Sequence, residues 1–202
     1  KRLAEQFDCA FVPVLLPSGK KQIMHCLRHI IRQYGISKKA RVECAFPFLC
    51  TAQKLRGETL VTGLCADGHF GLSKTAMIHF REPQEKFDQF RTDYFSKPDA
   101  GGVQGIQKIC NTYDVQLVNP YLHPSIFKLF IGRSWDELNK PRQKEPIRAA
   151  FPELDDLKLP RHTNLQLGDS KIAERLGGAA MSYWTGTKSA VAAYNKIRKA
   201  RP

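Results

Sequence analysis

The chain has 202 residues, of which 42% are apolar and 25% are charged, and its formal net charge is +13 at pH 7. This composition is ordinary for a globular protein, so it excludes wholesale disorder, and the basic excess favours attraction to polyanions. No apolar run approaches the roughly 18 to 20 residues of a membrane-spanning helix, so the sequence predicts no transmembrane segment.

The N-terminal part of the chain predicts a strand followed by a clear helix. Strand-forming residues fill 7–16, where Pro13 indicates an edge strand because proline cannot donate a ladder hydrogen bond. A helix over 18–34 follows, since Ile23 and Leu27 begin an apolar stripe that recurs at helical spacing.

Alternating side chains then predict three antiparallel strands. These strands cover residues 41–50, 59–65 and 70–80. The pair Asp67-Gly68, between the last two, is typical of a hairpin turn. The three segments together indicate a meander.

The next segment predicts two helices and a last strand. Pro83 suits the first turn of a helix that ends near Tyr94, a short helix passes through 106–110, and 115–118 has strand character. The order favours an α+β fold, with an antiparallel sheet and packed helices. Its plan is close to the ferredoxin-like split βαβ unit with an extra strand. We assign residues 1–119 to this core domain.

Beyond the core, prolines break the chain, and residues 120–202 are predicted to pack on the core or on a partner. The segment Ser134–Glu137 fits a capping box, which predicts a short helix. Residues 140–167 are interpreted as an extended, wrapping segment. Two closing helices are predicted, over about 169–184 and 187–199.

The basic side of the first predicted helix is the most specific surface signal. At about 100° per residue, Lys21, Arg28 and Arg32 lie opposite the apolar stripe. A solvated helix face is the alternative interpretation, but the segment 9–42 contains no acidic residue, whereas solvated faces usually mix both signs. The candidate RNA- or anion-binding residues here are Lys20, Lys21, Arg28, Arg32, Lys38, Lys39 and Arg41.

The end of the chain repeats the basic pattern. From residue 188 onward it has five basic residues and no acidic one. Two interpretations are equally good: a tail that contacts RNA, or a helix C-terminus at which positive charge is favoured by the helix dipole. The candidate residues here are Lys188, Lys196, Arg198, Lys199 and Arg201.

Possible catalytic and metal sites are incomplete in the sequence. His25 and His29 have a spacing that can hold a metal, but the two-histidine protease motif needs a Glu where Cys26 stands. The helix start at Lys20 and Lys21 resembles a phosphate loop but lacks the first Gly and the final Ser or Thr of the Walker pattern. We therefore predict no metal and no cofactor, although an anion at this helix start is physically reasonable.

The predicted hairpin carries a second set of polar residues. Asp67, His69, Ser73 and His79 could supply an orienting group, a base and a nucleophile. The nucleophile motif G-x-S-x-G is absent, and His69 and His79 fit the polar face of a strand. The sequence therefore gives no catalytic residue.

The cysteines and the first residues bear on the compartment. Six cysteines show no CxxC pair and no compact framework, so we interpret them as reduced. The chain begins with Lys1 and Arg2, which fits a fragment or a mature form without its targeting peptide. Together with the basic charge this favours the matrix side of the mitochondrion, and otherwise the cytoplasm.

Three functions are compatible with these observations. The first is a non-catalytic structural subunit that contacts RNA in a ribonucleoprotein such as an organellar ribosome, with RNA and protein subunits as partners. The second is an accessory subunit of a respiratory or ATP-synthase-type membrane complex. The third is an enzyme that binds a phosphate-bearing substrate at Lys20 and Lys21. The charge at both ends of the chain favours the first.

Overall fold

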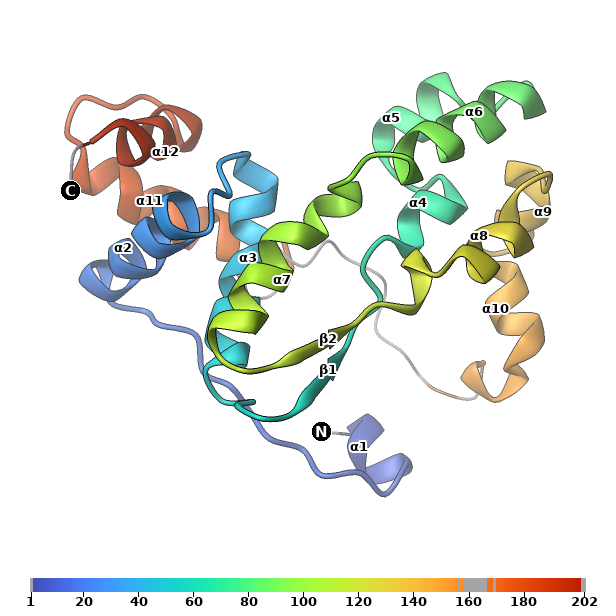
Figure 1. Cartoon of the computed structure of the whole chain (residues 1–202), viewed down its shortest axis with the longest axis horizontal. Helices are drawn as coiled ribbons and strands as arrows, with labels where there is room; N and C mark the ends of the chain where they lie inside the picture. The colour runs from blue at the N-terminus through green and yellow to red at the C-terminus, as the bar shows by residue number, and fades with distance from the viewer. Residues whose placement is uncertain (1, 156, 158–166, 169, 201–202) are drawn as a thin grey trace. The chain divides into compact units, whose positions relative to one another are not determined.

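The computed structural model describes residues 2–155, 157, 167–168 and 170–200. Over these residues the chain is mostly helical, and its sheet consists of β1 (Thr59–Val61) and β2 (Gln116–Val118) (Figure 1). The predicted α+β fold with an antiparallel sheet is therefore wrong.

The two short strands pair in parallel. The amide of Gln116 donates to the carbonyl of Glu58 at 3.0 Å, and farther along the amide of Thr62 donates to Val118 at 2.9 Å. Both strands therefore advance in the same direction along the ladder. The prediction of strand structure at 59–65 and 115–118 is right in part, but the expected antiparallel neighbours are helices.

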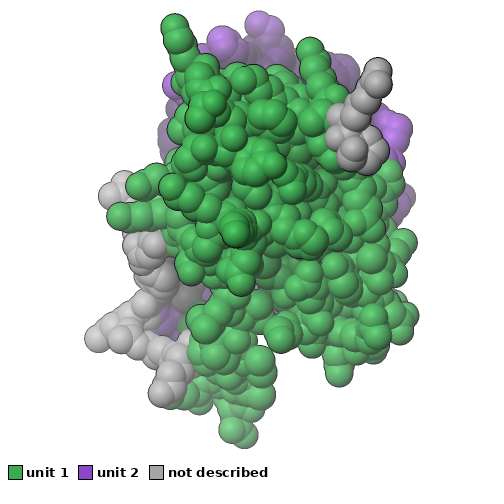
Figure 2. Space-filling view, turned by 90° about the vertical axis from the view of Figure 1, so that its left-hand side faces the viewer, with its two compact units in different colours: residues 1–59, 105–116, 161–202 green, residues 60–104, 117–160 purple. Residues whose placement is uncertain are grey.

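The chain forms two compact units, each built from separate segments of the sequence (Figure 2). Unit 1 contains residues 1–59, 105–116 and 161–202, and unit 2 contains residues 60–104 and 117–160. A boundary between the units falls within each of the two strands.

Unit 1 is a cluster of helices with an apolar core. In this cluster α2 packs against α11 and η1, and α11 also packs against α12. The helices are α1 (Arg2–Gln6), α2 (Lys20–Arg28), the π-helical turn η1 (His29–Gln33), α3 (Lys39–Ala52), most of α7 (Val103–Thr112), α11 (Ile172–Tyr183) and α12 (Ala190–Lys199).

The predicted first helix is confirmed as α2 followed by η1. Its apolar stripe lies in the core, where Ile23 is 2% exposed and Leu27 is fully buried. In η1 the amide of Tyr34 donates to the carbonyl of His29, five residues back, at 3.2 Å. This wider turn changes the angular position of the side chains that follow, compared with a uniform α-helix.

The segment predicted as the strand 41–50 is the helix α3. Its buried residues Val42, Ala45, Phe46 and Leu49 follow helical spacing, a pattern that overlaps with the alternation used for the strand prediction. Pro47 lies inside this helix, where it lacks the N–H that would donate to the carbonyl four residues back. Burial of the stripe therefore outweighs the local cost of the proline.

Unit 2 consists of shorter helices around a small aromatic core. Its fully or nearly buried residues are Phe70, Phe87, Phe130 and Leu138. The elements are α4 (Ala66–Phe70), α5 (Lys74–His79), α6 (Gln84–Phe95), η2 (Ala100–Gly102), η3 (Pro120–Leu122), α8 (Pro124–Phe130), α9 (Trp135–Asn139), α10 (Glu145–Ala150) and η4 (Pro152–Leu154).

The predicted hairpin around residues 67–68 is replaced by two short helices, α4 and α5. Gly71 ends α4 in the left-handed conformation, with φ 61°, and a Cβ there would lie 2.5 Å from Cε2 of Phe87. The hydroxyl of Ser73 then accepts from the amide of Ala76 at 3.1 Å and caps α5. The end of α4 at Gly71 and the cap of α5 at Ser73 therefore lie where the sequence predicted a strand.

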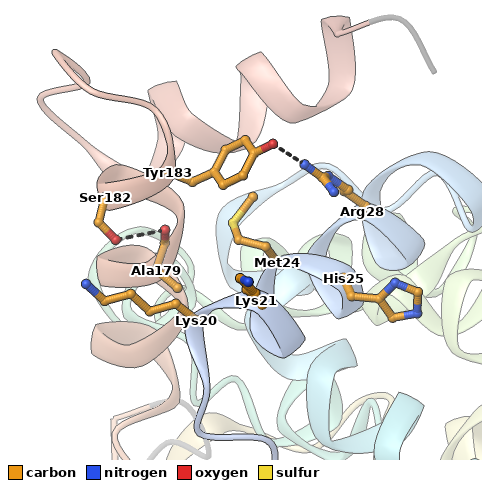
Figure 3. A pocket seen from close by; sticks show the side chains of 8 residues that line it. All are labelled: Lys20, Lys21, Met24, His25, Arg28, Ala179, Ser182 and Tyr183. Carbon is orange, nitrogen blue, oxygen red and sulfur yellow. Dashed lines mark hydrogen bonds between the residues drawn. The ribbon is translucent and has the colours of Figure 1, made fainter.

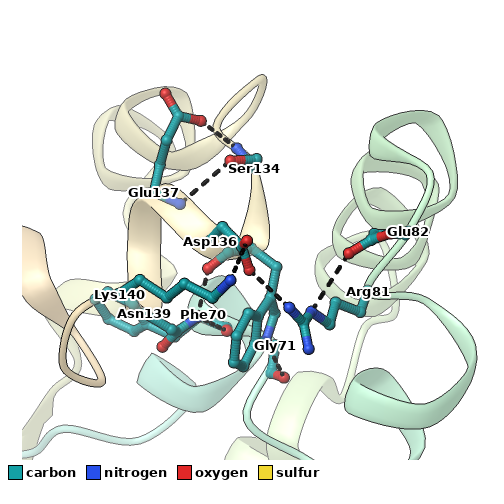
Figure 4. A network of polar contacts seen from close by, with 10 residues as sticks. Phe70, Gly71, Arg81, Glu82, Ser134, Asp136, Glu137, Asn139 and Lys140 are labelled. Carbon is teal, nitrogen blue, oxygen red and sulfur yellow. Dashed lines mark hydrogen bonds and ion pairs between the residues drawn. The ribbon is translucent and has the colours of Figure 1, made fainter.

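A polar network holds α9 in unit 2 (Figure 4). The predicted capping box is confirmed, since Ser134 and Glu137 exchange both backbone–side-chain hydrogen bonds. Asp136 accepts from Arg81 at 2.9 Å and from Lys140 at 2.5 Å. Unit 2 therefore pairs many of its own charges.

The other predicted segments have mixed outcomes. The predicted strand over 7–16 is wrong, because residues 7 and 8 lie in a turn and residues 9–18 form an irregular segment, in which Leu15 is 90% exposed. The segment 140–167 is not simply extended, because it contains α10 and η4, while residues 158–166 lie outside the described part. Four predicted helices are confirmed: α6, α7, α11 and α12.

Where the structure describes the chain, none of its helices combines the length and the apolar character needed to cross a membrane, as the sequence predicted.

Candidate functional site

A pocket of about 460 Å³ lies on unit 1 between α2 and α11 (Figure 3). Its floor is formed by two apolar residues, Met24 and Ala179, which are only 3% and 4% exposed. Basic side chains of α2 surround this floor, and two residues of α11 complete the wall of the pocket. The lining residues are Lys20, Lys21, Met24, His25, Arg28, Ala179, Ser182 and Tyr183.

Helical spacing on the two elements gathers these residues. On α2, Lys21, His25 and Arg28 are separated by four and three residues, so they share one side of the helix. On α11, Ala179 and Tyr183 are separated by four residues and share a side in the same way. Because α2 packs against α11, the two sides meet at the pocket.

Arg28 and Tyr183 form the contact that joins the two helices at the pocket. Nη2 of Arg28 donates to the hydroxyl of Tyr183 at 2.6 Å, and Cζ of Arg28 lies 4.9 Å from the centre of the tyrosine ring. The two side chains point toward each other in Figure 3, with Met24 below their hydrogen bond in this view. The contact holds the tyrosine ring in place, although its side chain remains half exposed.

The charge at the pocket is positive and largely unneutralised. Lys20 and Lys21 are exposed and form no ion pair with any residue that the structure describes. No acidic residue is among the described residues that line the pocket. The helix α2 also begins without a side-chain cap, at Gly19. An anionic group can therefore approach without meeting a carboxylate.

Two histidines lie beside the basic residues of α2. The ring centres of His25 and His29 are 4.4 Å apart. Burial lowers the pKa of His29 because it disfavours the charged imidazole, and electrostatic repulsion by the nearby His25 lowers it further. Within the described residues, no group of three or more His, Cys, Asp or Glu side chains is arranged to hold a metal.

Arg32 is not part of the pocket, although the sequence placed it on the same helix face. It follows the start of the π-helical turn, and its Nε donates to the carbonyl of Ile197 at 2.8 Å. Arg32 therefore satisfies a carbonyl in the last turn of α12.

The three predicted residues around the start of α3 are separate from the pocket lining. Lys38 is the exposed N-cap residue of α3. Lys39 pairs with the buried Glu43 at 2.8 Å, and Arg41 is half-buried. The pairing of Lys39 reduces its availability to an external anion.

The predicted C-terminal residues lie on or next to α12. Lys188, Arg198 and Lys199 are exposed, and Nζ of Lys196 lies 6.0 Å from the centre of the Trp184 ring. Arg201 lies outside the described residues. The exposed cations remain available to an anionic partner.

The residues considered for a nucleophile, base and orienting group have other roles in unit 2. Asp67 pairs with Lys144 at 2.9 Å, and the hydroxyl of Ser73 caps α5. His69 is fully buried, with Nε2 2.7 Å from the carbonyl of Tyr121, whereas His79 is exposed at the end of α5.

The sequence predicted the basic half of the pocket but missed its α11 half. Lys20, Lys21 and Arg28 were all candidates, and the structure brings them together. Tyr183 and Ser182 were not, because they lie more than 150 residues away along the chain. The signal available in the sequence was the helical spacing of Tyr183 from Ala179 on the predicted helix over 169–184.

Comparisons of the chain with protein-family models, with curated proteins and with solved structures found no match.

Proposed function

We propose that this chain is a non-catalytic subunit of a ribonucleoprotein, and that unit 1 is the part that contacts RNA. The supporting observation is the division of charge between the units. Unit 1 contains 20 Lys and Arg residues against 7 Asp and Glu, a net +13, whereas unit 2 contains 12 of each, a net zero. The whole basic excess therefore belongs to one unit.

Ion pairing strengthens this contrast. In unit 2, Asp136 and Asp155 each pair with two basic side chains. In unit 1, Lys20, Lys21, Lys188 and several other cations have no such partner among the described residues. Cations that a protein leaves unpaired are the groups that neutralise phosphates and release counterions when RNA binds.

The pocket between α2 and α11 is the most defined part of this basic surface. It combines four basic side chains with a fixed aromatic ring, the two kinds of group that bind phosphates and bases. A non-catalytic role agrees with the positions of three polar residues of unit 2. Asp67 pairs with Lys144, Ser73 caps α5, and His79 is exposed.

Charge reversal at the pocket tests the proposal. Lys20→Glu combined with Lys21→Glu should weaken binding of a fluorescently labelled RNA by about tenfold at low salt, because two phosphate contacts become repulsive. Acidic residues in the first turn of a helix are favourable, so α2 should remain folded.

The matched control is Lys74→Glu combined with Lys86→Glu in unit 2. Both lysines are exposed, lie in the first turn of a helix and have no ion pair among the described residues. The net charge changes by the same amount as in the Lys20 and Lys21 variant. Because unit 2 is not proposed to contact RNA, affinity should nevertheless stay within about twofold of the original protein. Equal weakening by both double variants would contradict the proposed role of unit 1.

A further inference from the structure

We infer that the pocket between α2 and α11 binds one unpaired nucleotide of a single-stranded RNA segment. The nucleobase would lie against Tyr183 over the apolar floor of the pocket, and the two flanking phosphates would contact Lys20 and Lys21. This inference rests on the proposed function and adds the structural class of RNA that the site recognises.

The size of the pocket favours a single nucleotide. Its volume of about 460 Å³ lies within the range of sites that enclose small ligands. In a double helix the bases are stacked and paired in the interior, so only phosphates and sugars reach a protein surface of this kind. Unpaired bases can instead leave the stack and enter a pocket.

The pocket has an apolar part and a charged part, as a nucleotide has. Met24 and Ala179 are almost fully buried and provide a surface for the flat base. Lys20 and Lys21 are exposed at the start of α2, where they can contact the flanking phosphates without a competing carboxylate in the lining. A phosphate alone would make no use of the apolar floor of the pocket.

Tyr183 is the residue that makes stacking possible. Its side chain is 52% exposed, although its hydroxyl accepts the 2.6 Å hydrogen bond from Arg28. The indole of Trp184 also packs against the ring, edge to face, with 5.3 Å between centres. A ring that is fixed before binding loses little conformational freedom when a base stacks on it.

The test compares single-stranded and double-stranded RNA of the same length. Tyr183→Leu should lower affinity for a labelled 12-nucleotide unstructured RNA by about tenfold, since loss of a stacking ring weakens binding by about fivefold or more, and should leave affinity for the 12-base-pair duplex within twofold. Tyr183→Phe, which keeps the ring, should bind the single strand at least fivefold more tightly than Tyr183→Leu.

Phe151→Leu in unit 2 is the matched control, because it also removes a ring that is half exposed. It should change neither affinity. If Tyr183→Leu lowers both affinities equally, or lowers neither, the inference is overturned while salt-dependent RNA binding by unit 1 still stands. If the original protein binds neither RNA, the proposed function itself fails.

Discussion

Arg91 lies fully buried in unit 2, where it provides donors to the end of a helix. Its guanidinium donates to the carbonyls of Phe130 at 2.6 Å and Arg133 at 2.8 Å, and it pairs with Asp88. It also lies over the ring of Phe87, with 4.1 Å from Cζ to the ring centre. This single side chain therefore joins α6 to the C-terminus of α8.

Arg91→Met should destabilise the protein by about 2–4 kcal/mol, because the carbonyl of Phe130 would lose its buried guanidinium donor and Asp88 would lose its ion-pair partner. Urea unfolding measures the change. Arg133→Met, at an exposed position nearby, should stay within about 0.5 kcal/mol of the original protein. A similarly small effect for Arg91→Met would show that the buried contacts contribute little.

His69 makes the stability of unit 2 sensitive to acid. Burial lowers the pKa of its imidazole, the positive charge of Arg91 lowers it further, and Nδ1 has no hydrogen-bond partner in the described structure. The unfolded chain, with a histidine pKa near 6.5, then binds the proton more readily than the folded chain. The neutral ring therefore contributes stability above about pH 6.5, and this contribution is lost as the pH falls.

His69→Phe should make the unfolding free energy less dependent on pH between pH 7 and pH 5. The variant will be less stable at pH 7, since the carbonyl of Tyr121 loses its partner, but the comparison concerns the slope. Urea unfolding at several pH values gives both quantities. The same pH slope in both proteins would contradict the role of His69.

Among the elements, α2 and α3 show which parts of the fold local sequence determines. The apolar stripe of α2 fits only a helix. In α3, however, Val42, Phe46 and Cys50 belong both to an alternating pattern and to a helical one. The alternation favoured the strand prediction, and burial against the rest of unit 1 decides for the helix. The pairing of β1 with β2 joins segments far apart in sequence, which no local pattern can reveal.

The π-helical turn separates the roles of two arginines that the sequence placed on one face. Arg32→Gln should lower stability by about 0.5–1.5 kcal/mol, because the carbonyl of Ile197 loses its donor. RNA affinity should stay within about twofold. Arg28→Gln should instead weaken RNA binding by about fivefold, through loss of the pocket charge and of the hold on Tyr183. Unfolding and RNA-binding measurements on both variants test these roles, and the reverse pattern of effects would contradict them.

In the whole molecule, the distribution of charge was only half visible in the sequence. The basic excess at the two ends of the chain was plain, and it singled out Lys20, Lys21 and Arg28, which the structure brings together at one pocket. The assembly of these ends into unit 1 depends on packing between α2, α11 and α12. That packing brings Tyr183 to the pocket, so the aromatic part of the site could not be found from sequence spacing alone.

The salt dependence of RNA binding tests the central claim most directly. Affinity for a single-stranded RNA should fall linearly with salt on a double-logarithmic plot, and reversal of Lys20 and Lys21 should make the slope shallower by about 1.4, the value for two lost phosphate contacts. Reversal of Lys74 and Lys86 should leave the slope unchanged. A slope near zero for the original protein, or one that the Lys20 and Lys21 reversal does not alter, would contradict the account.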